Sequence, residues 1–126
     1  MGENGKVQEY LKSAEEWLKA AKSSLKSAPE PAAFNALHSA ELAAKAALVM
    51  KTGEEHKTHN VGGEFGKHFR DRVGNQVCRE LSRKMMRYSK LRYPDEEVGE
   101  DEAREIIKFS EEFLGTVKAL LEVNGL

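Results

Sequence analysis

Apolar residues recur every three or four positions along most of the chain, and this spacing constrains the fold more than any other feature of the sequence. The first segment shows it most regularly, at Val7, Leu11, Ala14, Leu18, Ala21, Leu25 and Ala28. Such a period matches the roughly 3.6 residues of a helical turn, whereas a strand would alternate apolar and polar side chains. No segment shows that alternation, so the sequence predicts an all-α fold.

Prolines and glycines mark where the first two helices end. The first helix is predicted over residues 7–28, because Pro29 disfavours a helical conformation at the residue before it. Pro31 suits the first turn of a second helix that runs to about Thr52. Gly53 then stands where a left-handed C-cap residue is common, so the second helix is predicted to end there.

The second half of the chain contains one helix with an irregular stripe and one regular helix. The apolar positions that begin at Phe65 step by four residues and drift around the helix, so a bend or break is predicted near Gly74. Pro94 ends this segment, and a last helix begins near Glu100 with acidic residues at its positive end. We therefore predict one domain over residues 1–126, an antiparallel up-and-down bundle of four helices, or five if the third is broken.

Composition narrows the class of protein. Hydrophobic residues make up 40% and charged residues 33% of the chain, as in soluble globular proteins. No apolar run approaches the roughly 20 residues that span a bilayer, so no membrane contact is expected. The single cysteine, Cys78, is predicted to be a buried structural thiol, which points to the cytoplasm. Neither a thiolate cluster nor an H-E-x-x-H motif is present in the sequence, so no metal and no other cofactor are expected.

The predicted second helix carries charged side chains where its apolar stripe should be. Glu41 and Lys45 fall at the centre of that stripe, four residues apart in the order that favours an ion pair along a helix, and His38 falls at its edge. A buried ion pair adds little stability, because desolvation offsets the attraction. Three interpretations stay open: an intramolecular pair that is buried or solvated, a polar seam at a dimer interface, and the wall of a ligand cleft.

Charge is also unevenly distributed along the chain. Residues 67–92 contain nine basic and two acidic residues, whereas residues 95–112 contain nine acidic and two basic residues. The two segments either pair with and neutralise each other, or the basic one forms a face for phosphate or RNA. Arg79, Arg83 and Arg87 are spaced four residues apart and share one side of such a helix.

Two sets of residues resemble the signatures of HEPN domains. The first covers the predicted second helix and the loop after it, at Ala40, Glu41, Lys45, Ala46, Leu48, Gly53, Thr58, His59 and Asn60. The second is Arg92, Tyr93, Pro94 and Asp95, followed by an acidic helix start and a long amphipathic segment. The order and spacing of these sets are most similar to those of the small stand-alone HEPN proteins (the UPF0332 group).

The resemblance implies a helical bundle that commonly dimerises, and it implies two kinds of activity. Many members are paired with a minimal nucleotidyltransferase in a toxin–antitoxin-like system, while others are metal-independent ribonucleases with an R-polar-x4-6-H motif. In this chain Arg70 and Asp71 are followed, after four residues, by Gln76 in place of that histidine. Because glutamine cannot act as a general acid near neutral pH, we assign no catalytic residue.

The sequence therefore predicts a non-catalytic HEPN-like protein, expected to be a homodimer, that binds a nucleotide or phosphate ligand, partners a minimal nucleotidyltransferase, or does both. Arg92 and Tyr93 would supply phosphate charge and base stacking, with Arg87 in support. The full set of expected ligand-binding residues is His38, Glu41, Lys45, Arg87, Arg92 and Tyr93. Two alternatives stay open: an RNA-binding protein or ribonuclease with a degenerate motif, and a purely structural dimeric interaction module.

Overall fold

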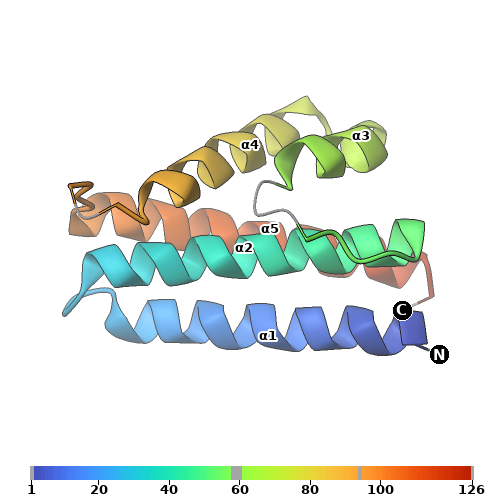
Figure 1. Cartoon of the computed structure of the whole chain (residues 1–126), viewed down its shortest axis with the longest axis horizontal. Coiled ribbons are helices and arrows are strands. Elements are labelled where there is room, and N and C mark those ends of the chain that lie inside the picture. The colour runs from blue at the N-terminus through green and yellow to red at the C-terminus, as the bar shows by residue number, and fades with distance from the viewer. Residues whose placement is uncertain (1, 58–60, 94, 126) are drawn as a thin grey trace.

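The computed structural model describes residues 2–57, 61–93 and 95–125, and within them it contains five helices and no strand (Figure 1). The helices are α1 (Gly2–Ser24), α2 (Pro29–Thr52), α3 (Gly62–Val73), α4 (Asn75–Lys90) and α5 (Glu100–Val123). The predicted all-α bundle is confirmed, in its five-helix form. In the described part of the chain, no helix is both long and apolar enough to cross a bilayer.

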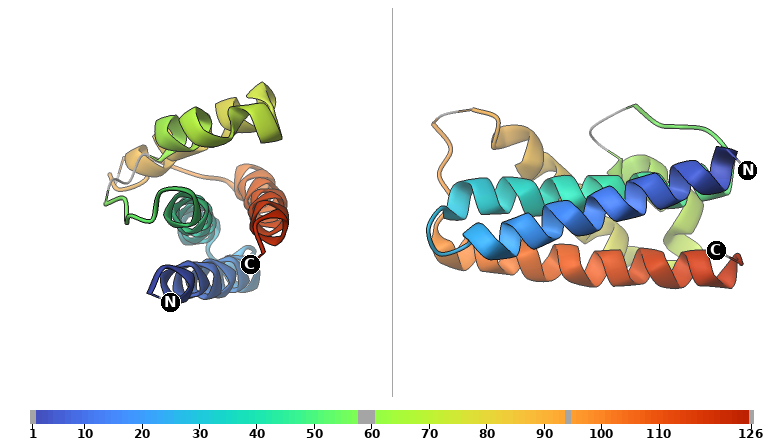
Figure 2. Two further views of the ribbon diagram at one scale, coloured as in Figure 1. Left: turned by 90° about the vertical axis from the view of Figure 1, so that its right-hand side faces the viewer. Right: turned by 90° about the horizontal axis from the view of Figure 1, so that it is seen from below.

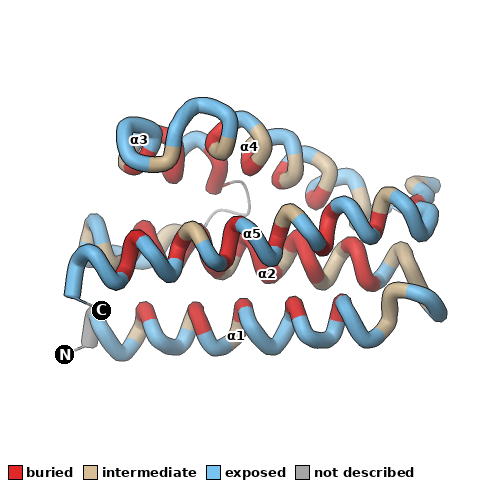
Figure 3. The backbone as a smooth tube through the Cα atoms, turned by 180° about the vertical axis from the view of Figure 1, so that it is seen from behind, coloured by how far each residue is buried: buried red, intermediate tan, exposed pale blue. Residues whose placement is uncertain are grey.

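Helix α2 lies at the centre of the bundle, between α1, α5 and the layer formed by α3 and α4 (Figure 2). Buried positions therefore occur all around α2, whereas α1 buries a single stripe (Figure 3). Most of these positions in α2 are alanines, whose small side chains let neighbouring helices approach closely. Two buried hydroxyls tie the layers together: Ser39 Oγ donates to the Ala14 carbonyl at 2.7 Å, and Ser110 Oγ donates to the Ala36 carbonyl at 2.8 Å.

The turn between α1 and α2 begins earlier than predicted. Helix α1 ends at Ser24, and not at residue 28, as expected from Pro29 alone. The hydroxyls of Ser23 and Ser24 bond back to the carbonyls of Lys19 and Ala20, a contact that competes with regular helix geometry. At its other end α2 stops as predicted, because Gly53 adopts a left-handed φ of 76° and its N–H bonds to the Val49 carbonyl.

The predicted break in the third helix is confirmed at Gly74. Its φ of 92° and ψ of 161° redirect the chain between α3 and α4, and glycine tolerates this region because it lacks a Cβ. Gly62 of α3 lies against Ser82 of α4, where a Cβ on residue 62 would collide with the serine. Cys78 is buried beneath this hairpin, as the sequence predicted.

The basic and acidic segments pair with each other. Lys84 of α4 bonds to Glu105 of α5 at 2.8 Å, and Arg83 of α4 bonds to Glu80 of the same helix at 2.8 Å. Arg87 joins the same system, as described below. Neutralisation between the two segments, one of the two interpretations of the charge pattern, therefore occurs along the C-terminal half of α4.

Candidate functional site

Glu41 is the centre of a buried polar network on α2. Its carboxylate is only 1% exposed, and its Oε2 atom lies 3.1 Å from Lys45 Nζ one helical turn later. Its Oε1 atom lies 3.3 Å from Nδ1 of His38, three residues earlier. The i, i+3 and i, i+4 spacings put all three side chains on one face of the helix. The charged stripe is thus a buried intramolecular pair, one of the three interpretations that the sequence left open.

Tyr88 of α4 covers this stripe. Its hydroxyl lies 2.6 Å from Nδ1 of His38, and its ring packs against Phe34 with a centroid distance of 5.0 Å. Tyr88 also hydrogen-bonds to Glu41. Because Tyr88 is itself buried, it closes the network on the α4 side. Glu41 therefore lies inside the helical bundle and not on the wall of a cleft.

The network sets the protonation of its members. Burial raises the pKa of Glu41, but hydrogen bonds from His38, Lys45 and Tyr88 and the charge of Lys45 outweigh it and lower that pKa to about 2. Burial and the neighbouring Glu41 carboxylate raise the pKa of Tyr88 well above its usual value. Near neutral pH the carboxylate is therefore ionised, and the phenol keeps its proton and can donate it.

Two partly or fully exposed side chains lie over this network. Trp17 of α1, 38% exposed, packs edge-on against the His38 ring with centroids 4.8 Å apart. The exposed Arg92 holds its guanidinium 5.5 Å from the centroid of the Tyr88 ring. We call Trp17, His38, Tyr88 and Arg92 the aromatic–cationic cluster. It combines residues from α1, α2, α4 and the segment after α4. No local pattern in the sequence indicates that Trp17 and Tyr88 belong to it.

The hydrogen bonds that Arg87 makes to the described residues lead away from the aromatic–cationic cluster. Its Nε donates to Glu102 at 2.8 Å, its Nη1 to Glu96 at 2.6 Å, and its Nη2 to the Glu97 carbonyl at 2.7 Å. The guanidinium thus joins the end of α4 to the 91–99 connection and to the start of α5. Tyr93, in that connection, is 64% exposed and available to solvent.

Comparison with known families agrees with this architecture. The HEPN domain model matches residues 7–120, nearly the whole chain. The chain belongs to the HEPN family. HEPN domains are helical bundles, and the family is RNA-binding or nuclease-like in character. A search of curated proteins found no match to this HEPN protein.

The positions of the HEPN nuclease motif lie away from the buried network. Arg70 and Asp71 are exposed in the last turn of α3, and Gln76 is exposed in the first turn of α4, beyond the break at Gly74. Gln76 lines a hollow between α4 and α5 rather than the aromatic–cationic cluster. Four residues of the resemblance, Thr58, His59, Asn60 and Pro94, lie outside the described residues. Within the described residues, no three His, Cys, Asp or Glu side chains are grouped closely enough to hold a metal ion.

Proposed function

We propose that this HEPN protein binds a nucleotide or another phosphate-bearing ligand without catalysing its conversion, and that the ligand binds over the aromatic–cationic cluster. One observation carries the proposal: an accessible tryptophan against His38 and an accessible arginine over Tyr88 lie above a buried network that fixes these two side chains. A buried ion pair contributes little net stability, and here it holds His38 and Tyr88 in place.

The proposed roles follow from exposure and chemistry. Trp17 offers a π-face on which a base can stack, and the Arg92 guanidinium can bond bidentately to a phosphate. Tyr93, next to Arg92 and largely exposed, would add a second aromatic surface. Glu41 and Lys45 are too deeply buried to contact the ligand directly, so they act as positioning residues for His38 and Tyr88.

The sequence supports binding of a ligand without catalysis. The position where nuclease members of the family have histidine is Gln76, which can bond to a phosphate but cannot transfer a proton near neutral pH. A ribonuclease or RNA-binding role would instead use the basic side of α4. There Arg83 and Arg87 already bond to carboxylates, whereas Arg79 makes no ion pair with any side chain that the structure describes.

We extend the proposal to partners. The resemblance to small stand-alone HEPN proteins supports a homodimer and a minimal nucleotidyltransferase as the companion protein. Met86 and Tyr93, near the end of α4, are large apolar side chains that remain exposed in one protomer and that such a contact would cover. Copurification with a nucleotidyltransferase encoded beside it, lost in a Met86→Asp/Tyr93→Asp variant, would support the partnership. Persistence of the complex in that variant would place the contact elsewhere.

Trp17 provides a direct test of ligand binding, because it is the only tryptophan in the chain. Fluorescence of the protein is followed during titration with ATP, GTP, NAD and a short RNA, corrected for absorption by the ligand. A stacked base should quench Trp17. The Arg92→Ala variant should bind roughly tenfold more weakly, as expected for loss of a charge-assisted hydrogen bond.

The variant Arg79→Ala and the salt dependence of binding distinguish this site from its alternatives. Arg79→Ala removes an exposed arginine of α4 outside the aromatic–cationic cluster and should leave the affinity unchanged. If Arg79→Ala weakens binding while Arg92→Ala does not, and if binding falls steeply with salt, the basic side of α4 is the site. If no ligand changes either the fluorescence or the thermal unfolding of a folded protein, the binding proposal is wrong and the structural alternative is favoured.

A further inference from the structure

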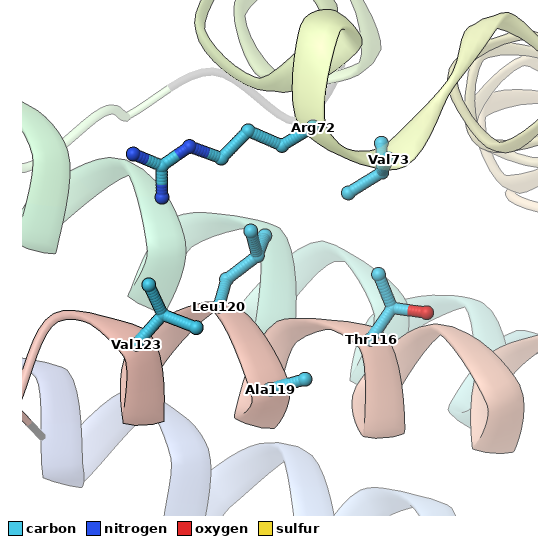
Figure 4. Close-up of a pocket in the computed structure, with 6 residues that line it drawn as sticks. All are labelled: Arg72, Val73, Thr116, Ala119, Leu120 and Val123. Carbon is cyan, nitrogen blue, oxygen red and sulfur yellow. The ribbon is translucent and has the colours of Figure 1, made fainter.

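A groove unrelated to the aromatic–cationic cluster lies between the end of α3 and the C-terminal half of α5 (Figure 4). It has a volume of about 490 Å³, within the range of about 300–1,000 Å³ typical of small-molecule sites. Its lining residues are Arg72, Val73, Thr116, Ala119, Leu120 and Val123. A separate hollow of about 310 Å³ lies between α4 and α5 and shares only Val73 with this groove.

The α5 wall of this groove is mostly apolar. Thr116, Ala119, Leu120 and Val123 follow the i, i+3, i+4, i+7 spacing of one helix face. Val123 is 76% exposed, and Leu120 points from α5 into the gap toward α3 (Figure 4). Leu120 is buried as part of the core, whereas Ala119 and Val123 are exposed, so this wall offers an apolar surface at the edge of the core.

The opposite wall supplies one cation. The Arg72 side chain extends from α3 along the gap, with its guanidinium on the side of Val123 (Figure 4). Arg72 forms no ion pair with any side chain in the described ranges, in contrast to Arg83 and Arg87. Its guanidinium is therefore free to bond to an anion whose apolar part rests on Val73, Leu120 and Val123.

From this combination we propose that the groove binds a small amphipathic anion, whose apolar body rests on the α5 wall and whose single carboxylate pairs with Arg72. The chemistry distinguishes it from the nucleotide proposal, because the groove has no aromatic face for a base and only one cation. The two sites are also separated in space. Arg72 precedes the first residue of α4, whereas Arg92 follows the last, so the length of α4, about 24 Å, lies between them.

The test uses the full chain with decanoate as the probe, kept below the concentration at which it forms micelles. Decylammonium and decan-1-ol have the same apolar body with a positive or no charge. Methyl NMR signals of Val73 and Leu120 should shift saturably with decanoate, weakly with decanol and not with decylammonium. Arg72→Gln should weaken decanoate roughly tenfold or more, and Arg79→Gln should leave it unchanged.

Two substitutions of Val123, at the rim of the groove, distinguish the effect of charge on decanoate binding from the effect of the lost apolar surface. Val123→Asp and Val123→Lys remove the same apolar wall from an exposed position, so both should fold. Decanoate should bind Val123→Asp at least several-fold more weakly than Val123→Lys, because only the aspartate repels it.

Three results would overturn the proposal. They are the absence of a saturable shift, equal binding of decanoate and decylammonium, and an unchanged affinity in a folded Arg72→Gln variant. If the Val73 and Leu120 signals instead shift with protein concentration in the absence of any probe, the groove is a contact between copies of the chain and not a ligand site.

Discussion

Glu41 and Lys45 form an ion pair with a distance of 3.1 Å inside the bundle, where only 1% of the Glu41 side chain and 11% of the Lys45 side chain reach solvent. Both charges have lost most of their hydration, and each depends on the other for compensation. The pair is consequently sensitive to the loss of one member and tolerant of the loss of both.

This asymmetry gives the first prediction. Glu41→Met should lower the free energy of unfolding by about 3–5 kcal/mol, because Lys45 is left buried without its carboxylate. Glu41→Met/Lys45→Met should be less destabilised than Glu41→Met alone, since it leaves no charge uncompensated. Urea denaturation of Glu41→Met, Lys45→Met and the double variant gives the coupling energy between the two charges. Additive effects would show that the two charges do not depend on each other.

The low pKa of Glu41 gives a pH dependence. Folding lowers that pKa from an ordinary 4.5 to about 2, so the stabilisation is complete above pH ~4.5 and is lost as the pH falls toward ~2. The difference in free energy of unfolding between the unmodified protein and Glu41→Gln should therefore be largest near neutral pH and should shrink over this interval. Chemical denaturation at several pH values measures it. A difference that stays constant down to pH ~2 would contradict the prediction.

Arg87 is predicted to order the connection that carries Arg92. Arg87→Lys keeps the charge but cannot reproduce the fork of four hydrogen bonds to Glu96, the Glu97 carbonyl and both carboxylate oxygens of Glu102, and should cost about 1–2 kcal/mol. The same variant should cleave faster in the 91–99 connection during limited proteolysis. Arg83→Lys is the matched control, because its single ion pair is exposed and worth less than about 1 kcal/mol. Equal effects of the two substitutions would contradict a positioning role for Arg87.

Two glycines should respond in opposite directions to the same substitution. Gly74→Ala should destabilise by about 1–2 kcal/mol, because its φ of 92° is unfavourable for a residue with a Cβ. Gly115 lies within α5 with open space around its Cβ position, so Gly115→Ala should stabilise by about 0.5–1 kcal/mol. Thermal unfolding of the two variants checks this. Destabilisation by both would show that open space at Gly115 is not enough.

Most of the fold could be predicted because it depends on local patterns. The spacing of apolar residues fixes the helices, and Gly53 and Gly74 end them through backbone conformations that the sequence indicates directly. The predicted end of α1 was wrong by four residues. The hydroxyls of Ser23 and Ser24 bond to backbone carbonyls of the last turn and disturb the regular helix there, and the position of Pro29 carries no information about this effect.

The site could be predicted only where it lies within one helix. Glu41, Lys45 and His38 are neighbours by helical spacing alone, so their association could be anticipated. Trp17 and Tyr88 reach His38 from other helices, and their contacts depend on how those helices rotate when they pack. For Arg87, the charge pattern left a carboxylate partner and a phosphate partner both open, and it could not identify Glu96 and Glu102.

The hairpin of α3 and α4 has a looser connection to α2 than α1 and α5 have. These two helices pack chiefly against each other and touch α2 over short stretches, whereas α1, α2 and α5 form a core among themselves. Backbone amides of the hairpin are therefore expected to exchange with solvent together, through an opening that leaves the other three helices folded. Because Tyr88 belongs to α4, each such opening removes Tyr88 from Glu41 and exposes the carboxylate. It also separates Tyr88 and Arg92 from Trp17 and His38. The aromatic–cationic cluster is therefore complete only while the hairpin is packed on the bundle.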